Sequence, residues 1–179
     1  MCAGFHPGSE KEWNGHARVK REERVKKRWG EDPLKSLNRD RSHISYLSHL
    51  AWMISGYKQI STDSKYDSLY HSLCETMNRR IQHSEMQNFP TYPDEPIYVP
   101  EMLVAIVALA NYSRQNNGEY SQTVNQWVER AQEEWLDKKT GLLILYLPNS
   151  SSSMTGKGSY SALNCYYLTF IDKAFAKDQ

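Results

Sequence analysis

The sequence predicts an all-α fold built from stacked helical hairpins. Apolar residues recur at helical spacing in several segments, and a unit of helix, turn and helix repeats along the chain. The chain has 179 residues, of which 39% are hydrophobic and 12% aromatic, which suits one domain with a buried core. A disordered chain would combine low hydrophobicity with high net charge, and this sequence has neither.

The charge pattern excludes several classes of partner. The formal net charge is +1, so the chain has no overall field to attract nucleic acid or anionic lipid, and we expect no nucleic-acid partner. The longest apolar run, Met102 to Ala110, has nine residues, whereas a membrane helix needs about 20. We therefore expect no transmembrane segment in this chain. The three cysteines and six histidines lack metal-ligand spacing, so we expect neither a metal nor a cofactor.

Residues 1–33 form a basic N-terminal region of helix and linker. Eleven of the 22 Lys and Arg residues lie between Lys11 and Arg41. Glu12 to Trp29 is a predicted helix that ends before Asp32 and Pro33. Acidic residues alternate with the basic ones and aromatic interleaving is absent, which favours a solvated helix face over a nucleic-acid surface.

Residues 34–179 carry the repeated helical unit. His83 to Tyr98 contains three prolines and no helical period, so it is a predicted irregular loop. Leu142 to Leu147 has extended character, Asn149 to Ser159 is a predicted loop, and the residues from Phe175 are too few for an outer helix. The predicted helices are Asp40–Ile60, Ser64–Ile81, Glu101–Arg114 with Pro100 as its first helical residue, Tyr120–Leu136 and Tyr160–Ile171.

The repeat has a regular period. Tyr57, Tyr112 and Phe170 mark equivalent positions, separated by 55 and 58 residues. The first helix of each hairpin is the more apolar, which indicates an inner layer of buried helices and an outer layer of amphipathic ones. An α/α toroid and an open solenoid both satisfy this pattern. In either, the long loops precede the inner helices and gather at one rim, where a site would be built.

A closed toroid of six hairpins would need roughly 300 residues or more at this period. The chain holds about two and a half hairpins. We therefore expect a partial ring, incomplete at its C-terminus, that is completed by self-association or by additional hairpins of a longer parent protein. The composition indicates no compartment.

Three segments carry a family resemblance: Asn38–Leu50, Pro90–Pro100 and Lys157–Tyr167. They resemble a group of bacterial (α/α) toroid domains, loosely like linalool dehydratase-isomerase and related in architecture to glycosidase-type (α/α)6 barrels. The resemblance covers roughly residues 34–179. It implies a partial α/α toroid with a catalytic or binding cavity at the rim where the inner helices begin. It rests on element order and short motifs, so the dehydratase-isomerase chemistry is not carried over.

The first candidate site lies before the second inner helix. Prolines hold the adjacent carboxylates Asp94 and Glu95 in extended backbone. A carboxylate forced into an apolar cavity has a raised pKa and can serve as a general acid, so both residues are catalytic candidates. The alternative is that Asp94 or Glu101 only caps backbone N–H groups of the helix. The substrate-binding candidates in this segment are Tyr92, Tyr98 and Glu101.

The second candidate site lies at the start of the first inner helix. His43 and Tyr46 are three residues apart and share a predicted helix face, with Asp40 one turn earlier. A carboxylate can fix the tautomer of an imidazole for proton transfer, so His43 and Tyr46 are catalytic candidates, and Asp40 and Arg41 are substrate-binding candidates. The alternative is a hydrogen-bond network that caps the helix. His49 falls off this face and is expected to be structural.

Asn164 and Tyr167 share one side of the third inner helix and are also substrate-binding candidates. The sequence therefore favours a rim pocket that performs acid–base catalysis, as a lyase, isomerase or glycosidase-like enzyme, on a small uncharged hydroxylated substrate. The alternative is a non-catalytic binding or scaffolding module of helical repeats. Convergence of Asp94, His43 and Asn164 on one concave site would favour the enzyme.

Overall fold

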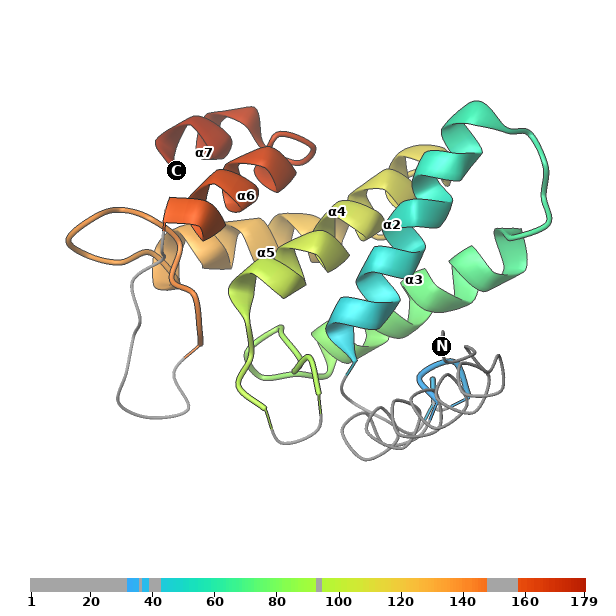
Figure 1. Ribbon diagram of the computed structural model, residues 1–179, viewed down its shortest axis with the longest axis horizontal. Helices are drawn as coiled ribbons and strands as arrows, with labels where there is room; N and C mark the ends of the chain where they lie inside the picture. Colours follow the sequence, from blue (N-terminus) through green and yellow to red (C-terminus); the bar gives the residue numbers. More distant parts are fainter. Residues whose placement is uncertain (1–31, 36, 39–42, 93–94, 148–157) are drawn as a thin grey trace, which may run out of the picture.

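The computed structural model describes residues 32–35, 37–38, 43–92, 95–147 and 158–179 (Figure 1). Over these residues the chain is α-helical without a β-sheet, so the all-α prediction is confirmed. The predicted helix over residues 12–29 lies outside this range. The helices are α2 (Ile44–Ile60), α3 (Asp67–Gln82), α4 (Val99–Gln115), α5 (Ser121–Glu134), α6 (Gly158–Leu168) and α7 (Lys173–Asp178).

The first helices of the three hairpins form one layer. Helices α2, α4 and α6 run in the same direction, and α4 packs against both of the others (Figure 1). Helices α3 and α5 run back in the opposite direction, contact each other and pack on α4. We call α2, α4 and α6 the inner layer. This arrangement of consecutive antiparallel hairpins places the start of each inner-layer helix on the same side of the molecule.

Helix α4 lies at the centre of the core. Every residue from Val99 to Ser113 is buried except Glu101, which is half-buried. Side chains of α2 and α6 meet each other across α4, with the Trp52 ring 5.3 Å from the Tyr167 ring. A helix that is apolar on all sides requires neighbours on all sides, and the two layers supply them.

The start of α2 differs from the prediction. The helix begins at Ile44, because His43 has a left-handed backbone with φ of 68°. The backbone N–H groups of His43 and Ile44 donate to the carbonyl oxygens of Thr91 and Pro90, at 3.1 and 3.3 Å. The predicted helix face shared by His43 and Tyr46 is therefore wrong, because His43 precedes the helix and pairs with the loop before α4.

The described parts of the segments that precede α4 and α6 pair with each other. The Val99 N–H group donates to the Leu145 carbonyl at 3.1 Å, and the Leu147 N–H group donates to the Ile97 carbonyl at 3.0 Å. Between these bonds Tyr98 and Tyr146 form an antiparallel bridge. The predicted extended character of residues 142–147 is thereby explained, because this segment pairs its backbone with the loop at the start of α4.

Aromatic pairs close the turns of the first two hairpins. The Tyr57 and Tyr66 rings lie 5.6 Å apart, and the Tyr112 and Tyr120 rings lie 5.3 Å apart. In the third hairpin Phe170 instead contacts Tyr166 of its own segment at 5.3 Å. The expected equivalence of the three landmarks therefore holds for the first two hairpins only.

The last residues form the short helix α7, whereas the sequence predicted only that the residues from Phe175 are too few for an outer helix. The Asp172 carboxylate caps α7 by accepting hydrogen bonds from the N–H groups of Ala174 and Phe175, at 2.9 and 3.0 Å. Phe175 is buried in the core. A strong cap and one buried aromatic residue are enough to order this turn, since both compensate for its length.

Because α4 lies at the centre of the core, truncation of its buried side chains should lower the free energy of unfolding. We expect Ile106→Ala to lower the free energy of unfolding by about 2 to 5 kcal/mol, because Ile106 is fully buried and its loss leaves a cavity. Urea denaturation followed by circular dichroism measures this. Met53→Ala on α2 is the control, with an expected change within about 0.5 kcal/mol because Met53 is 63% exposed. Equal losses in the two variants would contradict the central role of α4.

Buried thiol and phenol groups make the free energy of unfolding fall at alkaline pH. They lie toward the end of the hairpins that is opposite the starts of the inner-layer helices. Burial raises the pKa values of Cys74, Tyr70, Tyr112 and Tyr120 above their ordinary values. Folding favours their neutral forms, so this stabilisation is complete below the unfolded pKa values, about 8.5 for Cys and 10 for Tyr, and is lost as pH rises toward the folded values.

We therefore expect the free energy of unfolding to decline steadily above about pH 9. Tyr120→Phe removes one of these groups and should flatten the decline above about pH 10. Urea midpoints measured at pH values from 7 to the alkaline limit of stability test this. A midpoint that stays constant across this range would contradict it.

Candidate functional site

Three helices of the inner layer contribute side chains to one site. Glu101 of α4 places its Oε2 atom 4.0 Å from Nδ1 of His49 on α2. Burial raises the pKa of Tyr167 on α6, and the negative charge of Glu101 raises it further. We call Glu101, His49, Tyr167 and the adjoining Trp52 the inner-layer site.

Glu101 carries the most unusual atom of this site. Its Oε2 atom is buried and accepts no hydrogen bond within the described part of the chain. The side chain is in the first turn of α4, where the helix dipole stabilises a negative charge. Among the described residues, Oε2 of Glu101 accepts no hydrogen bond from a backbone N–H group, and the alternative that Glu101 only caps the helix stays a prediction. A buried oxygen that lacks a donor is uncommon in folded proteins, and a catalytic role, backbone strain or an ordered water or ion can explain it.

His49 has a defined tautomer. Its Nδ1 atom lies 2.7 Å from the Ser45 carbonyl oxygen, and a carbonyl oxygen can only accept a hydrogen bond. Nδ1 therefore carries a proton, and Nε2 is the proton-accepting atom of the neutral ring. The side chain is 43% exposed, so solvent reaches it. Sequence reasoning assigned His49 a structural role because it compared the residue with His43, which lies outside the helix.

Aromatic rings border the carboxylate and the imidazole. Trp52 lies one helical turn after His49 and packs edge-on against Tyr167 and Tyr166, with ring centres 5.3 and 6.4 Å away. Tyr166 is 49% exposed. Large rings with a polar group at one end suit ligands that combine an apolar surface with hydroxyl groups.

A second group of predicted residues meets at the rim. The Tyr98 and Tyr146 rings lie 4.6 Å apart. Hydrogen bonding to Tyr146 raises the pKa of Tyr98, and burial and the charge of Glu95 add to this effect. The predicted residues Glu95 and Tyr98 therefore lie near each other, beside a tyrosine that the sequence did not single out.

The remaining predicted residues lie among different neighbours. His43 is buried and packs edge-on against Tyr92, with ring centres 6.4 Å apart. Tyr46 is partly buried against the core. Asn164 is 2% exposed, and its buried Oδ1 atom accepts no hydrogen bond from the described residues. Asp40, Arg41 and Asp94 lie outside the described residues, so the convergence of Asp94, His43 and Asn164 stays a prediction.

Other features of the described residues concern metals and membranes. Within this part of the chain, no group of three or more His, Cys, Asp or Glu side chains is arranged to hold a metal ion. None of its helices is both long and apolar enough to cross a membrane.

Comparison with known proteins adds no relative. No family model matches the chain, and no curated protein is significantly similar to it.

The pKa values of Tyr167 and Tyr98 provide a test of this geometry. Removing the charge of Glu101 by Glu101→Gln should lower the pKa of Tyr167, because a nearby negative charge disfavours the phenolate. Glu95→Gln is the matched control and should lower the pKa of Tyr98 instead. Titration of protein labelled at the tyrosine Cζ carbons and followed by NMR measures both values. If Glu101→Gln leaves Tyr167 unchanged, the two residues are not neighbours in solution.

Proposed function

We propose that this chain is a partial α/α toroid domain that binds a small uncharged hydroxylated molecule at the inner-layer site and performs acid–base chemistry on it. The buried, unbonded Oε2 atom of Glu101 is the observation that carries the proposal. This buried oxygen lies 4.0 Å from the half-exposed imidazole of His49, and the charge of Glu101 acts on Tyr167, whose ring packs against Trp52. A sugar or a terpenoid-like alcohol offers the hydroxyl donor and the apolar surface that such a site would accommodate.

Glu101 and His49 have separate roles in this proposal. At 4.0 Å the two side chains are too far apart for a direct hydrogen bond. A substrate hydroxyl would donate to Oε2 of Glu101, which would accept its proton as a general base. Nε2 of His49 would exchange a proton with a second substrate atom, while the bond to Ser45 holds the ring in orientation. Trp52 and Tyr167 would cover the apolar face of the substrate.

The toroid part of the proposal rests on the inner layer. Parallel inner helices that pack side by side, with antiparallel outer helices behind them, are the repeating unit of such a ring. Large apolar side chains on the two edge helices are exposed, namely Met53 and Ile60 of α2 and Leu163 and Tyr166 of α6. Exposed apolar edges favour contact with further hairpins or with a second copy of the chain.

The same exposed edges favour one alternative function. A non-catalytic scaffolding module would use them to bind another protein surface, and Glu101 and His49 would then only contribute to that contact. The two functions differ in turnover, because a scaffold has none.

Glu101→Gln tests the catalytic proposal. A panel of carbohydrates and small alcohols is incubated with the wild-type chain, and product is measured by mass spectrometry. We expect Glu101→Gln to reduce the rate by about 10² to 10⁴, as is usual for loss of a general base. Asp94→Asn tests the carboxylate that the sequence favoured. Glu129→Gln is the control, because Glu129 is exposed on α5 in the outer layer, and its rate should match the wild type.

Equal rates in wild type and Glu101→Gln would contradict the catalytic role. Absence of turnover over the whole panel, together with no change in the Trp52 fluorescence or NMR signal on addition of any compound, would favour the scaffolding module.

A further inference from the structure

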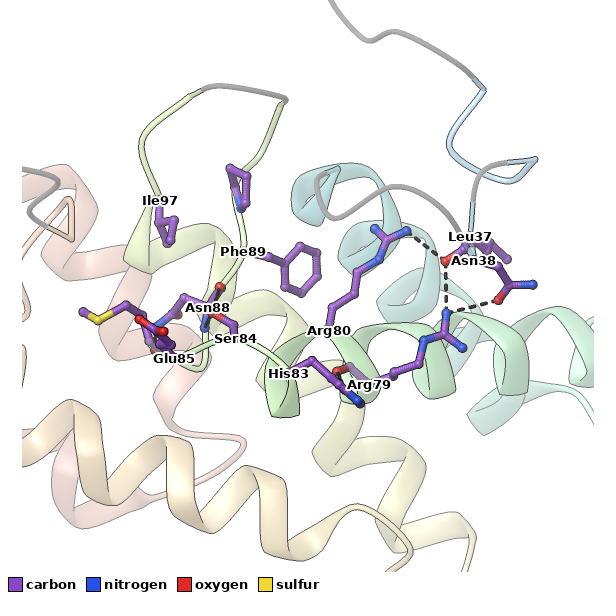
Figure 2. Close-up of a pocket in the computed structure, with 12 residues that line it drawn as sticks. Leu37, Asn38, Arg79, Arg80, His83, Ser84, Glu85, Asn88, Phe89 and Ile97 are labelled. Carbon is purple, nitrogen blue, oxygen red and sulfur yellow. Dashed lines mark hydrogen bonds between the residues drawn. The ribbon is translucent and has the colours of Figure 1, made fainter.

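The C-terminal end of α3 borders a cavity of about 690 Å3 whose arginines are already bonded (Figure 2). Nη2 of Arg79 and Nη2 of Arg80 both donate to the Leu37 carbonyl oxygen, at 3.0 and 3.1 Å. Arg79 also donates to Oδ1 of Asn38 at 3.1 Å. These bonds attach the segment around Leu37 to α3, so both arginines have a structural role in holding that segment.

A second cavity, of about 420 Å3, lies at the C-terminal end of α4. Small-molecule sites commonly have volumes of about 300 to 1,000 Å3. Arg114 of this cavity is in the last turn of α4 and Glu101 is in the first, about 20 Å apart along the helix, so the cavity is separate from the inner-layer site. The lining residues include Ser113 and Arg114 of α4, Asn117 of the following turn, Ser121 and Asn125 of α5, and Ile171 before α7.

The turn between α4 and α5 fixes the shape of this cavity. The Gly118 N–H group donates to the Ser113 carbonyl oxygen at 2.8 Å, and the Tyr120 N–H group donates to Oγ of Ser113 at 3.2 Å. Asn117 and Gly118 have left-handed backbone, with φ of 54° and 80°, a conformation that Asn and Gly adopt more readily than other residues. The cavity wall is therefore held in place by the chain itself, which lowers the cost of ordering it around a ligand.

Arg114 supplies the positive charge of this cavity. Its guanidinium donates to Oδ1 of Asn111 at 2.6 Å and to the Phe170 carbonyl oxygen. Both acceptors are neutral, and no carboxylate of the described residues forms an ion pair with Arg114. A guanidinium carries five N–H donors, so these two bonds orient the group and leave three donors for a ligand.

Apolar side chains form another part of the cavity lining. Ala110 and Val124 are buried, and Ile171 is partly buried against the core. No Asp or Glu is among the described residues that line the cavity. The carboxylate of Asp172, which follows Ile171, accepts hydrogen bonds from N–H groups of α7. The cavity therefore combines one cation with an apolar surface.

We propose that this cavity binds a small carboxylate that carries a short branched apolar group. The planar guanidinium of Arg114 matches the two oxygen atoms of a carboxylate. The Ser121 hydroxyl and the Asn125 amide supply further donors beside it. The apolar group lies against Val124 and Ile171, which a fully polar anion such as phosphate would leave uncovered. This site is independent of the proposed catalytic function, because it lies at the other end of α4.

The experiment titrates the full ¹⁵N-labelled chain with 3-methylbutanoate, 3-methylbutan-1-ol, acetate and inorganic phosphate. Two NMR signals report on the cavity: the Nε–H signal of Arg114, assigned with Arg114→Lys, and the backbone N–H signal of Gly118. The Nε–H signal of Arg130 on α5 is the internal control, because Arg130 pairs with Glu134 and does not line the cavity.

We expect 3-methylbutanoate to shift both cavity signals and to leave the Arg130 signal in place. The alcohol should bind about tenfold more weakly, because it lacks the charge-assisted hydrogen bonds to Arg114. Acetate and phosphate should also bind about tenfold more weakly, because they lack the branched apolar group. Equal affinity for 3-methylbutanoate and any of the other three compounds would overturn the proposal. So would cavity signals that none of the four compounds shifts.

Two variants place the carboxylate, with the Gly118 signal as the readout. Arg114→Gln should weaken binding of 3-methylbutanoate about tenfold, whereas Arg114→Lys, which keeps the charge, should weaken it less. Arg130→Gln is the matched control and should bind like the wild type.

Asn125→Asp tests the same position of the anion without removing any bond of Arg114. Asp has the shape of Asn, and its negative charge should repel the carboxylate and weaken binding about tenfold. Gln126→Glu is its control, because it adds the same charge at an exposed position of α5 that does not line the cavity, and it should have the smaller effect. Unchanged affinity in Arg114→Gln or in Asn125→Asp would overturn the proposal.

Discussion

The burial of α4 on all sides is the constraint on which the rest of the structure depends. Its side chains from Met102 to Ser113 are all buried, and each large one contributes about 1.5 to 3 kcal/mol when removed from water. No single neighbour can cover such a helix, so α2 and α6 flank it and α3 and α5 cover it from behind. The hairpin order of the chain follows from this need, because each outer helix is the short return from an inner one.

The same constraint determines where polar chemistry can occur. Glu101 is the one residue between Val99 and Ser113 that reaches the surface, and it does so in the first turn, where the dipole of α4 favours its charge. The backbone of the preceding loop bonds to the start of α2 through Thr91 and to the segment before α6 through Ile97 and Leu145. Each inner helix is therefore held at its beginning by the others, and side chains near that end have fixed neighbours.

Helical periodicity was enough to predict the all-α class and the buried helix after Pro100, because these depend on local spacing and on the length of apolar runs. Periodicity failed where hydrogen bonds to a distant part of the backbone determine the local structure. His43 leaves the helix because its N–H group bonds to Thr91, a residue far along the chain, and the exclusion of His49 depended on the wrong position of His43.

The loop between α3 and α4 holds the starts of the inner helices together. Pro90 and Ile97 of this loop supply carbonyl groups that anchor the start of α2 and the segment before α6, and Tyr98 of the same loop contacts Tyr146. A change in the position of this loop therefore acts on the starts of three inner helices together. Because Glu101 lies in the first turn of α4, directly after this loop, the loop also determines where its carboxylate lies.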